Sequence, residues 1–172
     1  MSVAIPVNKN FLSPTGYKFS IARAPNVAYS VQRINLPGIT LGSAELGTPF
    51  LTVYLPGTGI TYDTVSVEFK VDEDMTNYLE IFNWMLGLSV GKTFGGHQTV
   101  PRNSIDTGNN ILTSDLNLTI MNSASRGNVS VDFYDAYPVG LSDMQFDSTD
   151  TDINYINATV TFRYLQHTIT KL

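Results

Sequence analysis

The sequence has no cysteine, few charged residues and no long apolar run. The absence of cysteine excludes disulfides and thiolate metal sites, and it suits a protein that assembles in a reducing cytoplasm. No apolar stretch approaches the ~20 residues that a transmembrane helix needs, and the start of the chain lacks the charged and apolar regions of a signal peptide. We therefore expect no membrane insertion and no export by a signal peptide.

Charge is scarce, at 15% of residues against roughly 25% in average domains. The net charge is −5, and the ten Lys and Arg residues are scattered along the chain, so the basic patch of a nucleic-acid-binding protein is not expected. A neutral surface rich in Ser, Thr and Asn suits extensive subunit contact, because interface centres are depleted in charge. It suits an ordinary β-rich domain equally well.

Length and apolar content predict a single domain over residues 1–172. Hydrophobic residues make up 42% of the chain, enough for one core, and no linker or fixed repeat divides it. Proline and asparagine crowd residues 1–15. This composition predicts an N-terminal arm that becomes ordered only against another surface.

Alternation of apolar and polar residues predicts that most of the chain is β-structure. A strand break is expected at Ala136–Leu141, because Pro138 removes a ladder donor and Gly140 permits a bend. The segments with a period of two are Tyr17–Ile21, Val27–Arg33, Val65–Val71, Leu116–Ile120, Gly127–Tyr134 and Ile156–Tyr164.

One amphipathic helix is predicted over about residues 73–87. Its apolar side chains recur at spacings of three and four, from Met75 through Phe82 to Leu86. Asp72 is the expected N-cap, and Gly87 or Gly91 is expected to end the helix. No second helix is predicted.

Glycine and proline interrupt an apolar segment at residues 36–62, which predicts a projecting hairpin or extended loop with its tip around Gly57–Gly59. We expect this segment to reach a neighbouring subunit. The alternative is that its apolar side chains cover the protein's own barrel. The expected inter-subunit contact residues are Ile39, Leu41, Phe50, Val53, Leu55, Gly57 and Gly59.

No motif predicts a catalytic, cofactor-binding or metal-binding site. Gly87 and Gly91 are separated by three residues, not the four of a phosphate-binding loop, and they leave a helix instead of opening one. The acidic residues of 147–152 lack EF-hand spacing. The two histidines, His97 and His167, have no catalytic partner in the pattern. We expect no enzyme.

The order of several short motifs resembles the tail tube proteins of contractile-tailed bacteriophages. Each motif is weak alone, but the ordered set spans residues 17–165, nearly the whole chain. The matching segments are Ile34–Ile39, Thr61–Asp63 before Val65–Phe69, Val71–Asp74 and Phe82–Trp84 in the helical region, Ala136–Pro138, Asp143–Asp147 and Ala158–Tyr164.

The resemblance implies a mainly β fold, a β-sandwich or barrel of two packed antiparallel sheets with one flanking helix. It implies hexameric rings stacked into the inner tail tube, a virion part assembled in the bacterial cytoplasm. DNA would pass through an acidic to neutral lumen without specific binding during ejection. The implied partners are further copies of the chain, the tail sheath protein, the baseplate tube initiator and the tape-measure protein.

Three alternatives stay open. The first is a baseplate tube initiator or hub, which shares the tube fold. The second is a type VI secretion inner-tube protein. The third belongs to a different class, a β domain that binds a host surface or a carbohydrate, and it would need exposed aromatic side chains converging on a pocket.

Overall fold

A computed structural model of the chain describes residues 10–89, 112–149 and 154–172, and these contain nine strands and two helices. The predicted predominance of β-structure is confirmed. In chain order the elements are β1 (Tyr17–Ile21), α1 (Pro25–Ser30), β2 (Val31–Ile34), β3 (Ile39–Gly47), β4 (Thr52–Tyr62), β5 (Val65–Lys70), α2 (Thr76–Leu88), β6 (Ser114–Met121), β7 (Gly127–Leu141), β8 (Asn157–Arg163) and β9 (Gln166–Lys171).

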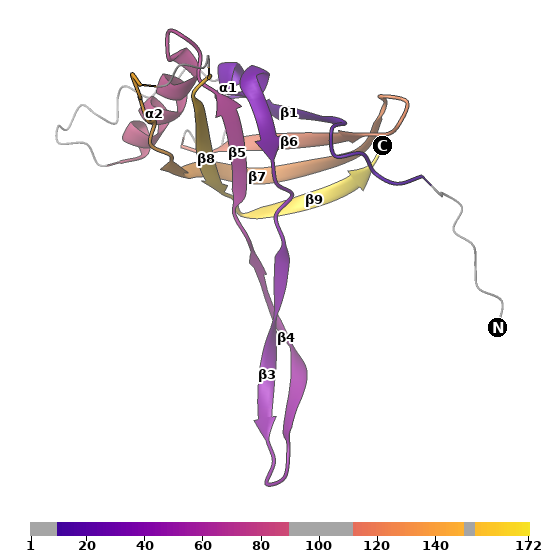
Figure 1. Cartoon of the computed structure of the whole chain (residues 1–172). Coiled ribbons are helices and arrows are strands. Elements are labelled where there is room, and N and C mark those ends of the chain that lie inside the picture. Colours follow the sequence, from indigo (N-terminus) through magenta and orange to yellow (C-terminus); the bar gives the residue numbers. More distant parts are fainter. Residues whose placement is uncertain (1–9, 90–111, 150–153) are drawn as a thin grey trace.

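The body of the protein is a pair of antiparallel layers that share the long strand β7. The strands follow the order β1–β6–β7–β8–β5–β2, and β9 also pairs with β7. The first part of β7 pairs with β6 and β9, whereas its last part pairs with β8. In Figure 1 the strands β6, β7 and β9 run across the direction of β5 and β8. The predicted arrangement of two packed antiparallel sheets is confirmed.

The change of partners along β7 occurs at Asp135, whose φ of 53° is left-handed. The pairing register with β6 shifts at the same point, as expected for a bulge that bends a strand. Two side chains hold the bend: the Asp115 carboxylate accepts the Asp135 N–H at 3.1 Å, and the Thr113 hydroxyl donates to Asp135 Oδ1 at 2.9 Å. The predicted break at Pro138 is wrong, because β7 continues through it with only a register shift.

The core lies between the two layers and is closed at one end by the helices. The expected alternation is confirmed, since one face of each central strand is buried and the other is polar. Trp84 of α2 is buried as predicted; its Nε1 donates to the Leu112 carbonyl at 2.9 Å. The largest buried side chains from the two layers are Leu116, Val131 and Phe133 on one side and Val65, Val67, Phe69, Val160 and Phe162 on the other.

The predicted long helix is present as α2, but its predicted N-cap is wrong. Met75 occupies the N-cap position with a φ of 55° and no side-chain capping bond. Asp72 contributes through its backbone, because its carbonyl accepts the Met75 N–H at 2.9 Å. Gly87 is a buried residue inside the last turn, not the end of the helix. Gly91 lies outside the described residues.

The short helix α1 was not predicted, and it replaces the first part of the strand expected over Val27–Arg33. Pro25 stands in its first turn, where its fixed φ suits a helix. Val27 is fully buried and Tyr29 is 95% exposed. In a strand these two residues would share a face, whereas the helix turns them to opposite sides. The pattern misleads because Val27, Tyr29 and Val31 recur at a spacing of two, which is typical of a strand. Strand β2 starts only at Val31.

The predicted N-terminal arm, residues 1–15, is described from Asn10 onward. Phe11 and Leu12 have no cover in the described structure, with exposed fractions of 98% and 64%. The chain joins the sheet just after them, where the Gly16 carbonyl accepts the Met121 N–H at 2.8 Å. The expectation that the arm packs against another surface remains a prediction.

Asn77 is a buried polar residue that joins three elements. Its Nδ2 donates to Ser30 Oγ at 2.9 Å and to the Lys70 carbonyl at 2.7 Å, and its Oδ1 accepts the Tyr78 N–H at 2.8 Å. Only 1% of its surface is exposed. The start of α2 is therefore tied to α1 and to the end of β5 by one amide.

We predict that Asn77→Ala lowers the free energy of unfolding by about 1–3 kcal/mol, because it leaves buried hydrogen-bonding groups without a partner. Urea denaturation monitored by Trp84 fluorescence measures this. Asn83→Ala, an exposed change on the same helix, is the matched control and should stay within about 0.5 kcal/mol of the wild type. Equal losses in the two variants would contradict the assignment.

Candidate subunit interface

Strands β3 and β4 form a hairpin that pairs with no other strand and projects away from the body (Figure 1). Every residue of β3 is exposed, and in β4 only Gly57 and Tyr62 are partly buried. The alternative that this segment covers the protein's own barrel is therefore wrong. A two-stranded hairpin is at best marginally stable in water by itself, and this one is joined to the body only at its base.

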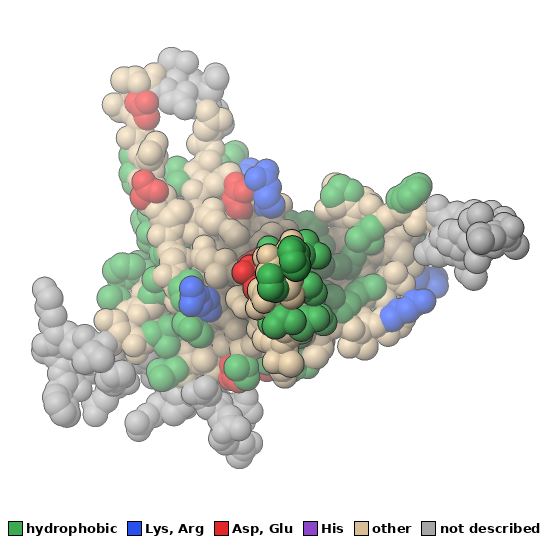
Figure 2. Space-filling view, turned by 90° about the horizontal axis from the view of Figure 1, so that it is seen from below, with side chains coloured by type: hydrophobic (Ala, Val, Ile, Leu, Met, Phe, Trp, Pro, Cys, Tyr) green, Lys and Arg blue, Asp and Glu red, His purple; other side chains and the backbone are tan. Residues whose placement is uncertain are grey.

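The hairpin exposes an unusual amount of apolar surface. The predicted contact residues Ile39, Leu41, Phe50, Val53 and Leu55 are 37–99% exposed. The sequence reasoning missed Leu46, Leu51, Tyr54 and Ile60, which are 54–68% exposed. The pairing register of β3 and β4 would have shown which apolar residues lie together on the hairpin, and the sequence alone does not give that register. Figure 2 views the hairpin from below, with hydrophobic side chains over much of its end. Contiguous patches of this kind mark interaction sites.

The apolar residues of the hairpin pair across its two strands. In the half near the body Leu41 pairs with Ile60, and in the distal half Leu46 pairs with Val53. Directly paired residues share a face of an antiparallel ribbon. Position 41 is odd and position 46 even, so a flat ribbon would place the two pairs on opposite faces. The two strands cross midway along the hairpin in Figure 1, at the register shift between Leu41 and Ser43.

The crossing occurs at a register shift where Gly42 faces the segment from Gly57 to Gly59. A Cβ atom on Gly57 would lie 2.7 Å from the Gly42 carbonyl oxygen, closer than real side-chain carbons approach. A Cβ atom on Gly59 would meet nothing within 4 Å. The close approach of the two backbones therefore requires glycine at position 57 but not at position 59.

The predicted hairpin tip around Gly57–Gly59 is wrong, because these residues lie midway along β4. The tip is the turn Thr48–Leu51. The Thr48 N–H donates to the Leu51 carbonyl and the Leu51 N–H donates to Thr48 Oγ1, both at 3.1 Å; the Thr48 hydroxyl also donates to that carbonyl. Phe50 stands at the end of this closed turn with 99% of its surface exposed.

The base of the hairpin is clamped to β5. Asn35 donates its N–H to the Ser66 carbonyl at 3.2 Å, its Oδ1 accepts the Ser66 N–H, and its Nδ2 donates to the Thr64 carbonyl at 3.2 Å. Asp63 donates its N–H to the Gly38 carbonyl at 3.1 Å. These bonds continue the β2–β5 pairing into the hairpin, so the hairpin leaves the body in a set direction.

An aromatic cluster supports the same base. The Tyr62 ring lies 5.8 Å from the Tyr164 ring and 5.3 Å from the His167 ring, and Phe133 packs against both Tyr164 and His167. Burial, with the nearby Asp63 carboxylate and Tyr62, raises the pKa of Tyr164 to about 12. The Tyr164 hydroxyl has no hydrogen-bond partner in the described residues, which is consistent with a group held neutral by packing.

Residues 2–170 match a family model described as phage tail tube protein. The chain belongs to this family. The tail tube terminator protein of Enterobacteria phage T4 is 29% identical over 96% of this chain and 94% of its own length. The fold is similar to a chain of the PVC sheath–tube complex of an extracellular contractile injection system, with a TM-score of 0.63 and 15% identity over 95% and 94% of the two chains. A chain of the PVC sheath/tube terminator gives 0.59 and 16% over 98% of each.

Membership of the tail tube family confirms the resemblance derived from the sequence, and this family is structural. Among the described residues no group of three or more His, Asp or Glu side chains is placed to hold a metal ion. No helix in the described part of the tail tube chain has the length and apolar character to cross a membrane. His97, Asp150 and Asp152 lie outside the described residues, and His167 packs in the aromatic cluster.

We predict that Gly57→Ala disrupts the hairpin whereas Gly59→Ala does not. The added methyl group of Gly57→Ala must push the Gly42 backbone away, which alters the crossing of the two strands. Backbone amide NMR of both variants in the monomeric state measures the change: shifts confined to β3 and β4 are expected for Gly57→Ala only. Similar spectra for the two variants would overturn this account of the crossing.

We predict that the unfolding free energy decreases as pH rises from about 10 to about 12, in part through Tyr164. A tyrosine is charged when deprotonated, and the pKa of Tyr164 is about 12 in the folded state against the ordinary 10.0 in the unfolded state. Between these two values the unfolded chain loses the proton more readily than the folded one. The contribution of Tyr164 to the unfolding free energy is therefore complete below pH 10 and is lost by about pH 12. Tyr164→Phe should reduce this decline, and Tyr54→Phe on the hairpin should not. Chemical denaturation at a series of pH values checks it; a profile unchanged by Tyr164→Phe would contradict it.

Proposed function

We propose that this chain is a ring-forming subunit of the inner tail tube, in which hexameric rings stack into a conduit for DNA ejection. The observation that carries the proposal is the hairpin, whose apolar residues touch no core of their own. Burial of the hairpin against neighbouring copies would remove its apolar surface from water, which favours assembly of a protein of the tail tube family. Each side chain of this size stabilises by about 1.5–3 kcal/mol when fully buried.

Free sheet edges supply the contacts within one ring. In the described part of the chain β1, β2 and β9 each pair with a single strand. Unpaired edges seek further strands, and a closed ring satisfies them by joining each sheet to its neighbour's. Identical subunits joined in this way would enclose a channel.

We assign the polar outer face of β1, β6, β7 and β9 to the lumen. Asn117 Nδ2 donates to Ser130 Oγ at 2.8 Å and to the Asp132 carboxylate, so much of this face is occupied with internal hydrogen bonds. Its charged side chains are Lys18, Asp115 and Asp132, a net charge of −1 (one cation, two carboxylates). A wall that is acidic to neutral would let phosphate slide past without holding it.

The wider assembly follows from this placement. The tail sheath protein would surround the tube, the baseplate tube initiator would start it, and the tape-measure protein would occupy it before DNA does. The similarity to a chain of a sheath–tube complex supports the first of these. We place the chain in the virion tail, assembled in the bacterial cytoplasm; the absence of cysteine suits that reducing compartment.

A second candidate is the tube terminator, a ring that ends the tube. The T4 relative that covers 96% of this chain carries that name, and so does the PVC terminator structure. A terminator and a tube subunit differ in one physical property: the tube subunit binds its own copies along the axis on both sides, whereas a terminator ring binds a tube on one side only.

The purified full chain should form stacked tubes at high concentration in negative-stain electron microscopy. Leu41→Glu should abolish them, because it places a charge in the apolar face of the hairpin and burying that charge is costly. Thr40→Glu, on the opposite face one residue away, is the matched control and should still assemble. Circular dichroism of both variants should match the wild type.

Two results separate the candidates. Closed rings of the wild type that never stack, but that attach to the ends of preformed tubes, would favour the terminator. Particles that remain single at all concentrations would contradict both candidates.

A further inference from the structure

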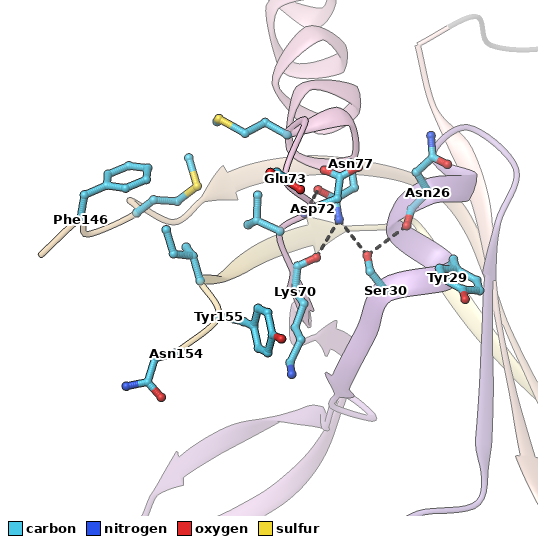
Figure 3. A pocket seen from close by; sticks show the side chains of 14 residues that line it. Asn26, Tyr29, Ser30, Lys70, Asp72, Glu73, Asn77, Phe146, Asn154 and Tyr155 are labelled. Carbon is cyan, nitrogen blue, oxygen red and sulfur yellow. Dashed lines mark hydrogen bonds between the residues drawn. The ribbon is translucent and has the colours of Figure 1, made fainter. Parts of the chain in front are cut away.

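A pocket lies at the end of β5 remote from the hairpin. Strand β5 starts at Val65, next to the base of the hairpin, and ends at Lys70, where the pocket begins. In Figure 1 the hairpin points down from this strand while α1 and α2 lie at its upper end. The pocket has a volume of about 860 Å³ and is bordered by α1, the start of α2, and the segments around Phe146 and Tyr155 (Figure 3).

The polar groups at the floor of this pocket are already paired. Asn77 bonds to Ser30 and to the Lys70 carbonyl, as Figure 3 shows. The Lys70 ammonium lies 4.8 Å from the centre of the Tyr155 ring. Asp72 and Glu73 are exposed at the rim, so both carboxylates keep access to water. A side chain that binds at this floor therefore need not supply hydrogen bonds to it.

Aromatic side chains stand open around the pocket. Tyr29, Phe146 and Tyr155 are 95%, 76% and 70% exposed. Such exposed aromatic residues around a cavity are typical of anchor sites, where a large apolar side chain of a partner is buried.

The hairpin tip offers apolar side chains of the kind that such an anchor site buries. The turn Thr48–Leu51 satisfies its polar groups internally, and Phe50 and Leu51 are 99% and 68% exposed. No charged residue occurs from Leu46 to Tyr62. The one charged residue of β3 and β4 is Glu45, three residues before the turn. A closed, uncharged turn loses little conformational entropy and little hydration when it binds.

We infer that this pocket receives the Phe50–Leu51 tip of a second copy in the next ring. The inference rests on the proposed tube function and names the surfaces that join the rings. Tip and pocket lie at opposite ends of β5, so one subunit cannot fill its own pocket. Contacts between different patches at opposite ends are head-to-tail, and they extend into an open stack when successive copies follow one axis. Every subunit then donates a tip along the axis and accepts one.

Disulfide cross-linking tests this contact, and the wild-type chain has no cysteine to interfere. The variant Phe50→Cys/Phe146→Cys is assembled, oxidised and run on a non-reducing gel. If the tip enters the pocket, the thiols come within the Cβ distance of about 3.5–4.5 Å that a disulfide needs, and a ladder of covalent multimers replaces most of the monomer. The matched control Phe50→Cys/Thr168→Cys, with its second thiol on β9, should stay monomeric on the gel.

The outcomes distinguish this inference from the proposed function. Tubes that form without a ladder would overturn the pocket contact and leave the tube function standing. A wild type that forms no tubes would overturn both. If the double variant does not assemble, Phe50→Cys and Phe146→Cys made separately and mixed should give covalent dimers and nothing longer; no dimers in such mixed tubes would overturn the contact.

Discussion

The pairing of β2 with β5 fixes the base from which the β3–β4 hairpin projects. The direction of the hairpin depends on this pairing. The two strands begin inside the sheet and continue, through the clamp made by Asn35, into a hairpin that has no other support. Since the base is fixed by hydrogen bonds and by the tilted contact between the rings of Tyr62 and Tyr164, the projecting apolar surface has a defined direction. A directed projection can meet the same site on every neighbouring copy.

The body of the protein encloses a hydrophobic core and leaves the edge strands of its sheets with a free side. Strand β7 belongs to both layers because it bends at Asp135, so a single strand holds them together. The helices α1 and α2 then cover one end, and Asn77 ties them to β5. Low surface charge fits this arrangement, because surfaces that pack against other copies cannot hold unpaired charge without a desolvation penalty.

The two surfaces of the proposed contact between rings lie beyond the two ends of one strand, β5. The hairpin tip is apolar, closed and uncharged, and the pocket beyond Lys70 has paired polar groups and open aromatic walls. Membership of the tail tube family and these two surfaces are the basis of the proposed function, in which the protein binds copies of itself.

The sequence by itself determined the β-rich class, the helix α2, the family and the apolar character of residues 36–62, because periodicity and composition are local properties. It did not place helix α1, because Val27, Tyr29 and Val31 recur at a spacing of two, which is the pattern of a strand. It also misplaced the hairpin tip and the bend of β7, since register depends on which strand pairs with which. Only the tertiary structure brought Asn77, Phe146 and Tyr155 to one pocket, because segments far apart in the chain meet there through long-range packing that no local pattern encodes.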